Sequence, residues 1–259
     1  MTRHQQLRYL KAMGIPVWVQ RTRTMSTEVV DEALPGQTSA AASGSLSSET
    51  LPADNKQPTP AHIGTLIPEQ PVPDCSTLDS QALQTLVNDC KRCVLHSSRK
   101  QPIFATGSLS ASYLVISDAP SFDEDRHSYA LAGKAGVLLN NMLSAINLST
   151  DNTCVTHTVK CRPPNDRMPQ TDEQTACLVY LNRQIELLKP KAILILGRSA
   201  AEHLLQQKSS LSAFRSKQHT YADTDIPVII TYHPRNLLRQ PADKRKAWED
   251  LKQFRALIE

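Results

Sequence analysis

The sequence predicts an α/β fold in which a central parallel sheet lies between two layers of helices. Apolar runs of strand length alternate with longer segments of helical spacing from residue 113 to the end of the chain. The run at 191–197 is apolar almost throughout, as is typical of parallel strands that are covered on both faces. This alternation predicts a three-layer α/β/α domain, with ligands bound where the strands end.

The individual elements follow from local patterns in chain order. Short apolar runs predict the strands, and apolar residues spaced three and four apart predict the helices. The pattern Thr171-Asp172-Glu173-Gln174 has capping-box form and predicts the start of a long helix. The predicted elements are a strand at 113–116, a helix at 135–148, a strand at 154–159, a helix at 171–189, a strand at 191–197, a helix at 199–206, a strand at 228–232 and a helix at 242–258.

Composition divides the chain into three parts. Residues 24–77 are rich in Ser, Thr, Ala, Pro and Gln, which predicts a disordered linker because they bury little apolar surface. The linker is net −6, residues 1–23 are net +5, and residues 78–259 carry the remaining +5 of a chain that is net +4. We therefore expect a short N-terminal helical peptide at 1–23, a linker at 24–77 and a mildly basic domain at 78–259, compatible with nucleic acid.

The sequence also predicts where the protein works. No run approaches the roughly 18 apolar residues of a membrane span, and the N-terminus is too polar for a secretory signal. We therefore expect a cytoplasmic protein without a membrane partner. In a reducing compartment, clustered cysteines favour a metal centre over disulfides.

Four of the six cysteines predict a metal centre. Cys90 and Cys93 form a tight C-x-x-C pair, and Cys161 and Cys177 follow far along the chain. Four thiolates suit either a tetrahedral zinc ion or a 4Fe–4S cluster, and the presence of only one tight pair favours the cluster. Four unrelated core cysteines are the remaining alternative. We place Cys75 in the linker, and Cys154 in a buried strand as a structural thiol.

Five short motifs, spread between about residue 86 and residue 254, carry a family resemblance. They are Cys90-x-x-Cys93-x-Leu95 with Arg99, Asp118-Ala119-Pro120 with Glu124-Asp125, Ala132-Gly133-Lys134-Ala135-Gly136, Val159-Lys160-Cys161-Arg162-Pro163-Pro164 with Ala176-Cys177, and Tyr232-His233-Pro234 with Leu237-Leu238-Arg239. In this order they resemble the family 4 uracil-DNA glycosylases, which are iron–sulfur members of their superfamily. The resemblance implies the superfamily fold, DNA as a partner and a structural 4Fe–4S cluster on the four cysteines.

The resemblance also implies roles for single residues. His233 would stabilise the departing uracil, and Asp118 would stand where the family has a glutamate that holds water. The motif after His233 would face DNA, with Leu237 and Leu238 on a wedging loop. Arg239 would contact the same DNA, and Arg235, which replaces the small residue usual after His-Pro, is predicted to contact it as well.

The base pocket departs from the family pattern. Leu131 stands in place of the phenylalanine that stacks on uracil, and His157 stands in place of the asparagine that reads its edge. Loss of stacking costs roughly 1–3 kcal/mol per base, and loss of the amide removes a specific contact. These changes predict weak or absent uracil excision. They also leave a helix-capping Asp118 and a core His233 as alternatives.

The first 23 residues carry a second resemblance. Leu10, Ile15 and Trp18 are the apolar members of a pattern similar to the N-terminal peptide of the psi subunit of bacterial DNA polymerase III. In that family the peptide binds the clamp loader, and the globular part meets the chi subunit. The sequence therefore favours a replisome adaptor bound to clamp-loader subunits, with a chi-like partner and with DNA, including single-stranded DNA. The alternatives are an active uracil or damaged-base glycosylase and a basic tail without a partner.

Overall fold

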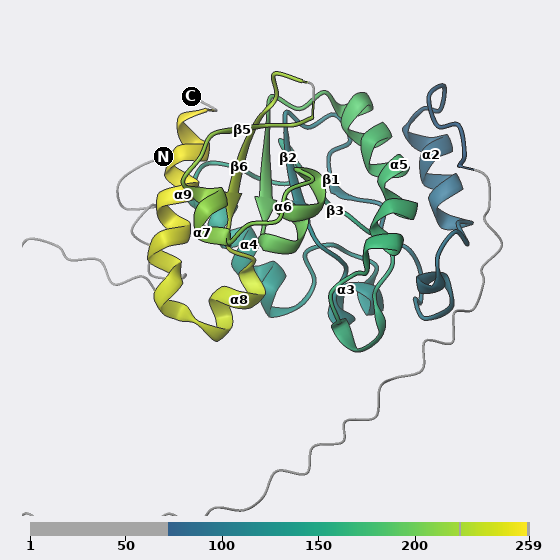
Figure 1. Cartoon of the computed structure of the whole chain (residues 1–259), viewed down its shortest axis with the longest axis horizontal. Helices are drawn as coiled ribbons and strands as arrows, with labels where there is room; N and C mark the ends of the chain where they lie inside the picture. The colour runs from purple at the N-terminus through teal and green to yellow at the C-terminus, as the bar shows by residue number, and fades with distance from the viewer. Residues whose placement is uncertain (1–71, 223, 258–259) are drawn as a thin grey trace, which may run out of the picture. The chain divides into compact units, whose positions relative to one another are not determined.

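A six-stranded mixed sheet with helices on both faces forms the centre of the computed structural model, which describes residues 72–222 and 224–257 (Figure 1). The strands are β1 (Thr106–Gly107), β2 (Tyr113–Ser117), β3 (Thr153–His157), β4 (Ala192–Leu196), β5 (His219–Thr220) and β6 (Pro227–Thr231). They lie in the order β1-β3-β2-β4-β6-β5. The predicted partner-binding residues Leu10, Ile15 and Trp18 lie outside the described residues.

The four central strands run parallel, and the two edge strands do not. Strands β3, β2, β4 and β6 pair in parallel register, whereas β1 and β5 pair antiparallel with β3 and β6. The predicted α/β fold with a parallel central sheet is therefore confirmed. The edge strands have two residues each, too few for a strand pattern to be seen in the sequence.

Helices cover the sheet on both faces because side chains alternate along each strand. Val115 and Leu194 point to one apolar cluster with α4 (Gly133–Ala145), α8 (Pro234–Arg239) and α9 (Lys244–Ala256). Leu114 and Ile193 point to the other cluster with α5 (Thr171–Leu188), α6 (Arg198–Leu204) and α7 (Leu211–Arg215). Every residue of β4 is buried, as its unbroken apolar run predicts.

A third apolar cluster joins α2 (Ser80–Asn88) to the outer side of α5, away from the sheet (Figure 1). Asp79 caps α2 by accepting a hydrogen bond from the amide of Ala82 at 2.8 Å. Cys75 is also buried in this cluster. The folded domain therefore includes this cysteine, which the composition had placed in the linker.

Helix boundaries differ from the sequence prediction where capping decides them. The capping box of α5 is formed by Gln170 and Glu173, so the cap is one residue earlier than the Thr171 pattern indicated. The helices α3 (Phe122–His127) and α8 are single turns or little more, and periodicity does not reveal them. Within residues 72–222 and 224–257, no helix combines the length and apolar character needed to cross a membrane.

Candidate functional site

A hollow lies at the carboxyl ends of the central strands, where the topology predicts a ligand site. Ser117 ends β2, Leu196 ends β4, and His233 follows β6 by two residues. The lining residues are Ser117, Ser121, Glu124, Ala130, Ala135, Gly136, Leu139, Val155, Leu196, His233, Pro234 and Arg235. Most of them are small or apolar, so a few polar atoms determine what the hollow can bind.

His233, Ser117 and Asp118 form a short hydrogen-bonded chain beside the hollow. Nδ1 of His233 accepts a hydrogen bond from the amide of Arg235 at 3.0 Å. The neutral ring therefore carries its proton on Nε2, which lies 2.9 Å from the hydroxyl of Ser117 and 3.6 Å from Oδ1 of Asp118. Ser117 in turn donates to Oδ1 of Asp118 at 3.3 Å.

Burial favours a neutral imidazole at His233. Burial lowers the pKa of His233, Asp118 opposes that shift, and Arg235 adds to it. The side chains of His233 and Asp118 are each 14% exposed, so both are close to the surface of the hollow. Oδ1 of Asp118 also accepts from the amide of Ala119 at 2.8 Å, which fixes the carboxylate. The arrangement presents an N–H donor and a carboxylate side by side.

The start of α3 forms another part of the wall of the hollow. Ser121 and Glu124 make a capping box in which a carboxylate oxygen of Glu124 accepts from the amide and the hydroxyl of Ser121, each at 2.8 Å. The second carboxylate oxygen of Glu124 lies 3.5 Å from Nε2 of His157. Burial alone would raise the pKa of Glu124, but His157 and Ser121 outweigh burial and hold it below its ordinary value of 4.5.

Replacing Glu124 by Gln is expected to remove a pH-dependent part of the stability. Because the folded-state pKa is lowered, ionised Glu124 stabilises the fold above about pH 4.5, and this contribution is lost as the pH falls through the folded-state pKa. Wild type should therefore exceed Glu124→Gln in free energy of unfolding at pH 7, and the difference should shrink towards pH 3.5. Denaturant unfolding at several pH values measures this, with the exposed Asp123→Asn as control. If the difference in free energy of unfolding between wild type and Glu124→Gln stayed constant with pH, the lowered pKa of Glu124 would be contradicted.

Gly136 allows the loop before α4 to fold tightly against the helix. A Cβ atom at this position would overlap with the carbonyl oxygen of Leu131, a backbone atom that cannot turn away. The first turn of α4 forms one wall of the hollow through Ala135 and Gly136.

We expect Gly136→Ala to destabilise the domain by about 1–3 kcal/mol, as overpacking of an ordered region does. Denaturant unfolding checks the value. Asn140→Ala, an exposed change on the same helix, is the control and should be close to neutral. A neutral Gly136→Ala would show that the loop can move away at little cost.

Two residues predicted for the base pocket do not line the hollow. Leu131 is 8% exposed and belongs to the apolar cluster of α4, α8 and α9. His157 is 1% exposed and lies behind Glu124. Ser121 and Glu124 stand at the surface of the hollow instead. The Ser-x-x-Glu spacing in the sequence is the signal that could have identified them, because it is a capping-box pattern.

The predicted DNA-facing residues divide into exposed and buried ones. Leu238 is 42% exposed and Arg239 is also exposed, whereas Leu237 is 1% exposed within the core. Leu237 therefore packs into the core while Leu238 faces outward, because consecutive residues of the helix α8 are rotated by about 100° around its axis. Arg235 lines the hollow.

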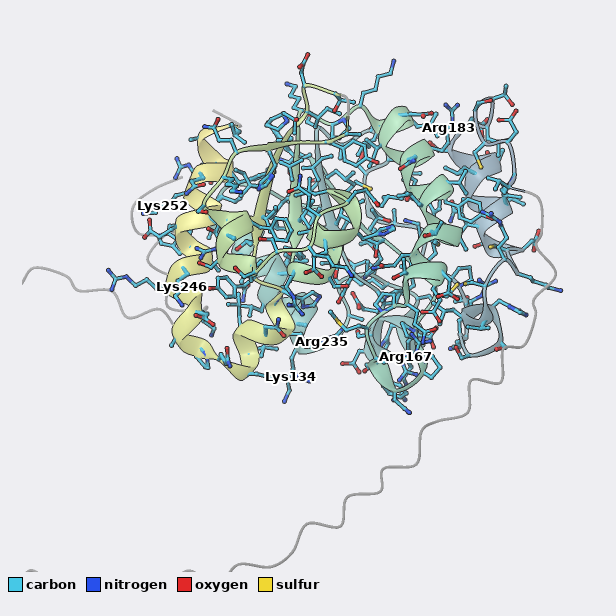
Figure 2. All side chains as sticks on the ribbon, in the orientation of Figure 1. Lys134, Arg167, Arg183, Arg235, Lys246 and Lys252 are labelled. Carbon is cyan, nitrogen blue, oxygen red and sulfur yellow. The ribbon has the colours of Figure 1, made fainter. Side chains whose placement is uncertain are left out.

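Basic side chains gather at the edge of the domain where the strands end. Figure 2 shows Lys134, Arg167 and Arg235 along this edge, which is the lower one in that view. Arg167 is held in place because Nη1 and Nη2 donate to the two oxygens of Glu173 at 2.8 and 2.5 Å. Lys134 is exposed beside the hollow. The edge thus presents positive charge around the hollow.

The four predicted metal-binding cysteines come together on a second hollow. Cys90 and Cys93 lie between α2 and the short helix η1 (Val94–Ser97), Cys161 follows β3, and Cys177 lies in the second turn of α5. All four line the same hollow and none forms a disulfide. Burial raises the pKa of Cys93 to about 11 and that of Cys177 to about 12, so these thiols keep their protons unless a metal replaces them.

Cationic and amide groups surround the sulfur atoms. Nη1 of Arg99 donates to the sulfur of Cys161 at 2.9 Å, and the amide of Lys160 donates to the sulfur of Cys177 at 3.3 Å. Nε of Arg92, a residue that also lines this hollow, is buried without a hydrogen-bond partner among the described residues. The donors and the positive charge suit a centre whose ligands carry negative charge.

Lys160, which lines the cysteine hollow, ties it to the end of β3. Its side chain is fully buried, and Nζ donates to Oγ1 of Thr156 at 2.6 Å, to the carbonyl of His157 at 2.9 Å and to Oε1 of Gln184 at 2.5 Å. The same residue binds the sulfur of Cys177 through its amide. The segment that carries Cys161 is thereby fixed to the end of β3.

Among the described residues, no three His, Cys, Asp or Glu side chains are close enough to hold one metal ion. A tetrahedral zinc ion with zinc–sulfur bonds of about 2.3 Å brings its sulfurs within about 3.8 Å of one another. The arrangement therefore does not support the zinc alternative.

Comparisons with known proteins give one consistent result. The family model described as "Uracil DNA glycosylase superfamily" matches residues 104–252. The Type-4 uracil-DNA glycosylase of Pyrobaculum aerophilum is 35% identical over 183 residues, which is 68% of this chain and 93% of that protein. The protein of the same name from Sulfurisphaera tokodaii is 36% identical over 178 residues, 66% of this chain and 81% of that protein. That from Saccharolobus solfataricus is 34% identical over 179 residues, 66% of this chain and 83% of that protein.

These matches overturn the functional role favoured by the sequence. A replisome adaptor bound to clamp-loader and chi-like subunits is contradicted, because the relatives that cover the domain carry the name of a DNA glycosylase. The likeness to the psi peptide finds no support, and the residues that suggested it lie outside the described part of the chain.

Proposed function

The chain belongs to the uracil DNA glycosylase superfamily, and from this premise we propose that it is a DNA repair enzyme that hydrolyses the bond between uracil, or a related damaged base, and deoxyribose. The observation that carries the proposal is the hydrogen-bonded chain of His233, Ser117 and Asp118 beside a hollow at the strand ends. It supplies the two kinds of group that this reaction needs.

The first group is a donor for the departing base. As the glycosidic bond breaks, negative charge develops on the base, and a fixed N–H aimed at a base oxygen stabilises it. Nε2–H of His233 suits this role, because the Arg235 amide fixes the tautomer and burial keeps the ring neutral. A neutral donor is not drawn into an ion pair before the charge develops. The incoming base would take the place of the Ser117 hydroxyl as the partner of Nε2.

The second group is a carboxylate for the sugar and the attacking water. Positive charge develops on the deoxyribose as the base leaves, and a nearby carboxylate stabilises that charge and orients water. Asp118 is held for this role by the Ala119 amide and the Ser117 hydroxyl. Although Asp118 is one methylene shorter than glutamate, its contact with His233 keeps it at the site.

We propose that Ser121 and Glu124 take part in recognising the base. Both line the hollow, whereas Leu131 and His157, which stand at the family's stacking and reading positions, are buried behind its walls. His157 would then act through Glu124, whose carboxylate it holds at 3.5 Å. The target base would enter the hollow after leaving the stack of bases.

DNA would approach the edge on which the hollow opens. Arg235, Arg239 and Lys134 would contact phosphates, since these exposed or partly exposed cations lie near the hollow. Leu238, which is 42% exposed at the end of α8, is the apolar side chain suited to wedge between bases.

For the second hollow we propose a structural 4Fe–4S cluster on Cys90, Cys93, Cys161 and Cys177. The donor set is four thiols on one hollow, and a cluster with an iron for each thiolate accepts sulfurs more widely spaced than a single zinc ion does. Arg99 balances part of the ligand charge through its contact with Cys161. When bound, the cluster would crosslink three parts of the chain, which are the loop between α2 and η1, the helix α5, and the segment that follows β3.

A direct assay tests the proposed function. Protein purified without oxygen is incubated with single- and double-stranded DNA that contains one uracil, and abasic sites are detected by alkaline cleavage. The proposal predicts abasic product from uracil DNA and none from the matched thymine DNA. Hypoxanthine and other deaminated bases are tested in the same way. Absence of product from every one of these substrates would contradict the proposal.

A further inference from the structure

Phe122 is an exposed aromatic residue at the mouth of the active-site hollow. It is 51% exposed, although it is the first residue of α3 and directly follows Ser121, which lines the hollow. Nothing in the capping box requires an aromatic side chain here, because the box is formed by Ser121 and Glu124.

Arg162 holds the ring from one side. Its guanidinium carbon lies over the Phe122 ring, 4.9 Å from the centroid. The same guanidinium donates through Nε to Asp166 at 2.7 Å, which fixes its direction. Since Arg162 covers one face of the ring, the exposed part of Phe122 comprises the other face and the edge.

Two of the three acidic side chains in this helical turn point inward, whereas Asp123 is exposed. Glu124 and Asp125 are 9% and 7% exposed. Glu124 binds Ser121 and His157, and Asp125 accepts from the amide of Lys100 at 3.0 Å. The aromatic ring is therefore the apolar outward-facing group of this helical turn, with the Arg162–Asp166 ion pair behind it.

We propose that Phe122 and Arg162 form a stacking platform for the DNA base next to the one that enters the hollow. This inference rests on the proposed glycosylase function and adds a second contact with the substrate. A free aromatic face with an arginine behind it is the chemistry that single-stranded nucleic acid recognises, because every base has a face to stack. The platform lies one residue from the hollow, so a neighbouring nucleotide of the same strand reaches it.

The platform predicts that the protein prefers single-stranded DNA to duplex DNA. In a paired duplex the neighbouring base already stacks within its own helix, whereas in single-stranded DNA its face is free to bind Phe122. It also offers an aromatic contact outside the hollow, in a protein that has leucine at the family's stacking position.

The experiment compares three variants on single-stranded DNA that carries a non-cleavable 2′-fluoro-deoxyuridine beside 2-aminopurine, a fluorescent base whose emission falls when it stacks. Phe122→Ala removes the ring, and Phe122→Trp keeps an aromatic face. Leu109→Ala is the control, because Leu109 is also exposed, at 43%, but lies between β1 and β2 before the amino end of the latter. Affinity and quenching are measured on this DNA, and excision is measured on ordinary uracil DNA.

Phe122→Ala should weaken binding by roughly 5- to 150-fold and abolish the quenching, in line with the loss of one stacked base. Phe122→Trp should retain both, and Leu109→Ala should resemble wild type. Unchanged binding and quenching in Phe122→Ala would overturn the platform and leave a protein partner as the occupant of this surface. Quenching that depends on Phe122 in a protein without excision would refute the proposed function but not the platform.

Discussion

His233→Ala is expected to lower the single-turnover rate of uracil excision by about 10²- to 10³-fold, the effect of removing one aligned donor to a developing negative charge. The donor is Nε2–H, whose position is set by the Arg235 amide on the opposite side of the ring. The variant also loses the cap that Nδ1 provides to α8, which is expected to destabilise the fold by about 1 kcal/mol. The excision rate and the free energy of unfolding are therefore both measured.

Two comparisons separate catalysis from folding. His127→Ala removes a histidine from the exposed end of α3, whose Nδ1 lies 2.7 Å from the carbonyl of Asp123, and should leave excision unchanged. Substrate affinity should change less than the excision rate in His233→Ala, because the donor acts mainly on the departing base. Equal rates in wild type and His233→Ala would exclude this histidine as the donor.

Cys177→Ala is expected to prevent assembly of the iron–sulfur centre and to destabilise the domain by several kcal/mol. A structural metal centre contributes its binding free energy to folding, and Cys177 is buried in α5 where no other side chain can replace it. Iron and acid-labile sulfide per protein, visible absorbance and denaturant unfolding measure the effect, all on protein purified without oxygen.

Cys154→Ala is the matched control for this change. Cys154 is a buried cysteine in β3 that does not line the cysteine hollow, so the variant loses a thiol of the same size. It should keep the full iron and sulfide content. Wild-type protein with stoichiometric zinc and without iron would contradict the iron–sulfur assignment, and normal iron in Cys177→Ala would remove this residue from the ligand set.

The central sheet could be predicted because its signals are local. The run at β4 is apolar throughout since both of its faces are covered, and the helix α5 shows its apolar period over five turns. The helix α3 and the two-residue edge strands could not, because elements of two to six residues are too short to show a periodic apolar pattern.

The site could be predicted in part for a similar reason. Sequence motifs pointed to His233 and Asp118, and in the structure His233 lines the hollow and Asp118 lies 3.6 Å from its Nε2. The motifs gave no indication that Leu131 and His157 would lie behind the walls of the hollow, because their positions depend on how α3 and the loop before α4 pack. The prediction of weak or absent uracil excision assumed that each substituted pocket residue was a lost contact with the base. Ser121 and Glu124 show that other side chains occupy the surface of the hollow.

The cysteine hollow has a consequence for the order of events during folding. Arg99 contacts Cys161 across 62 positions in the chain, and the ligands come from three segments that meet only when α5 has packed between the sheet and α2. Contacts of such long range form late, because the loops between them must close first. A newly made chain would thus offer separate thiols until most of the domain has formed. The proposed 4Fe–4S cluster would therefore bind to a nearly folded domain, and oxidation of Cys90 or Cys93 before that point would remove thiolates that it needs.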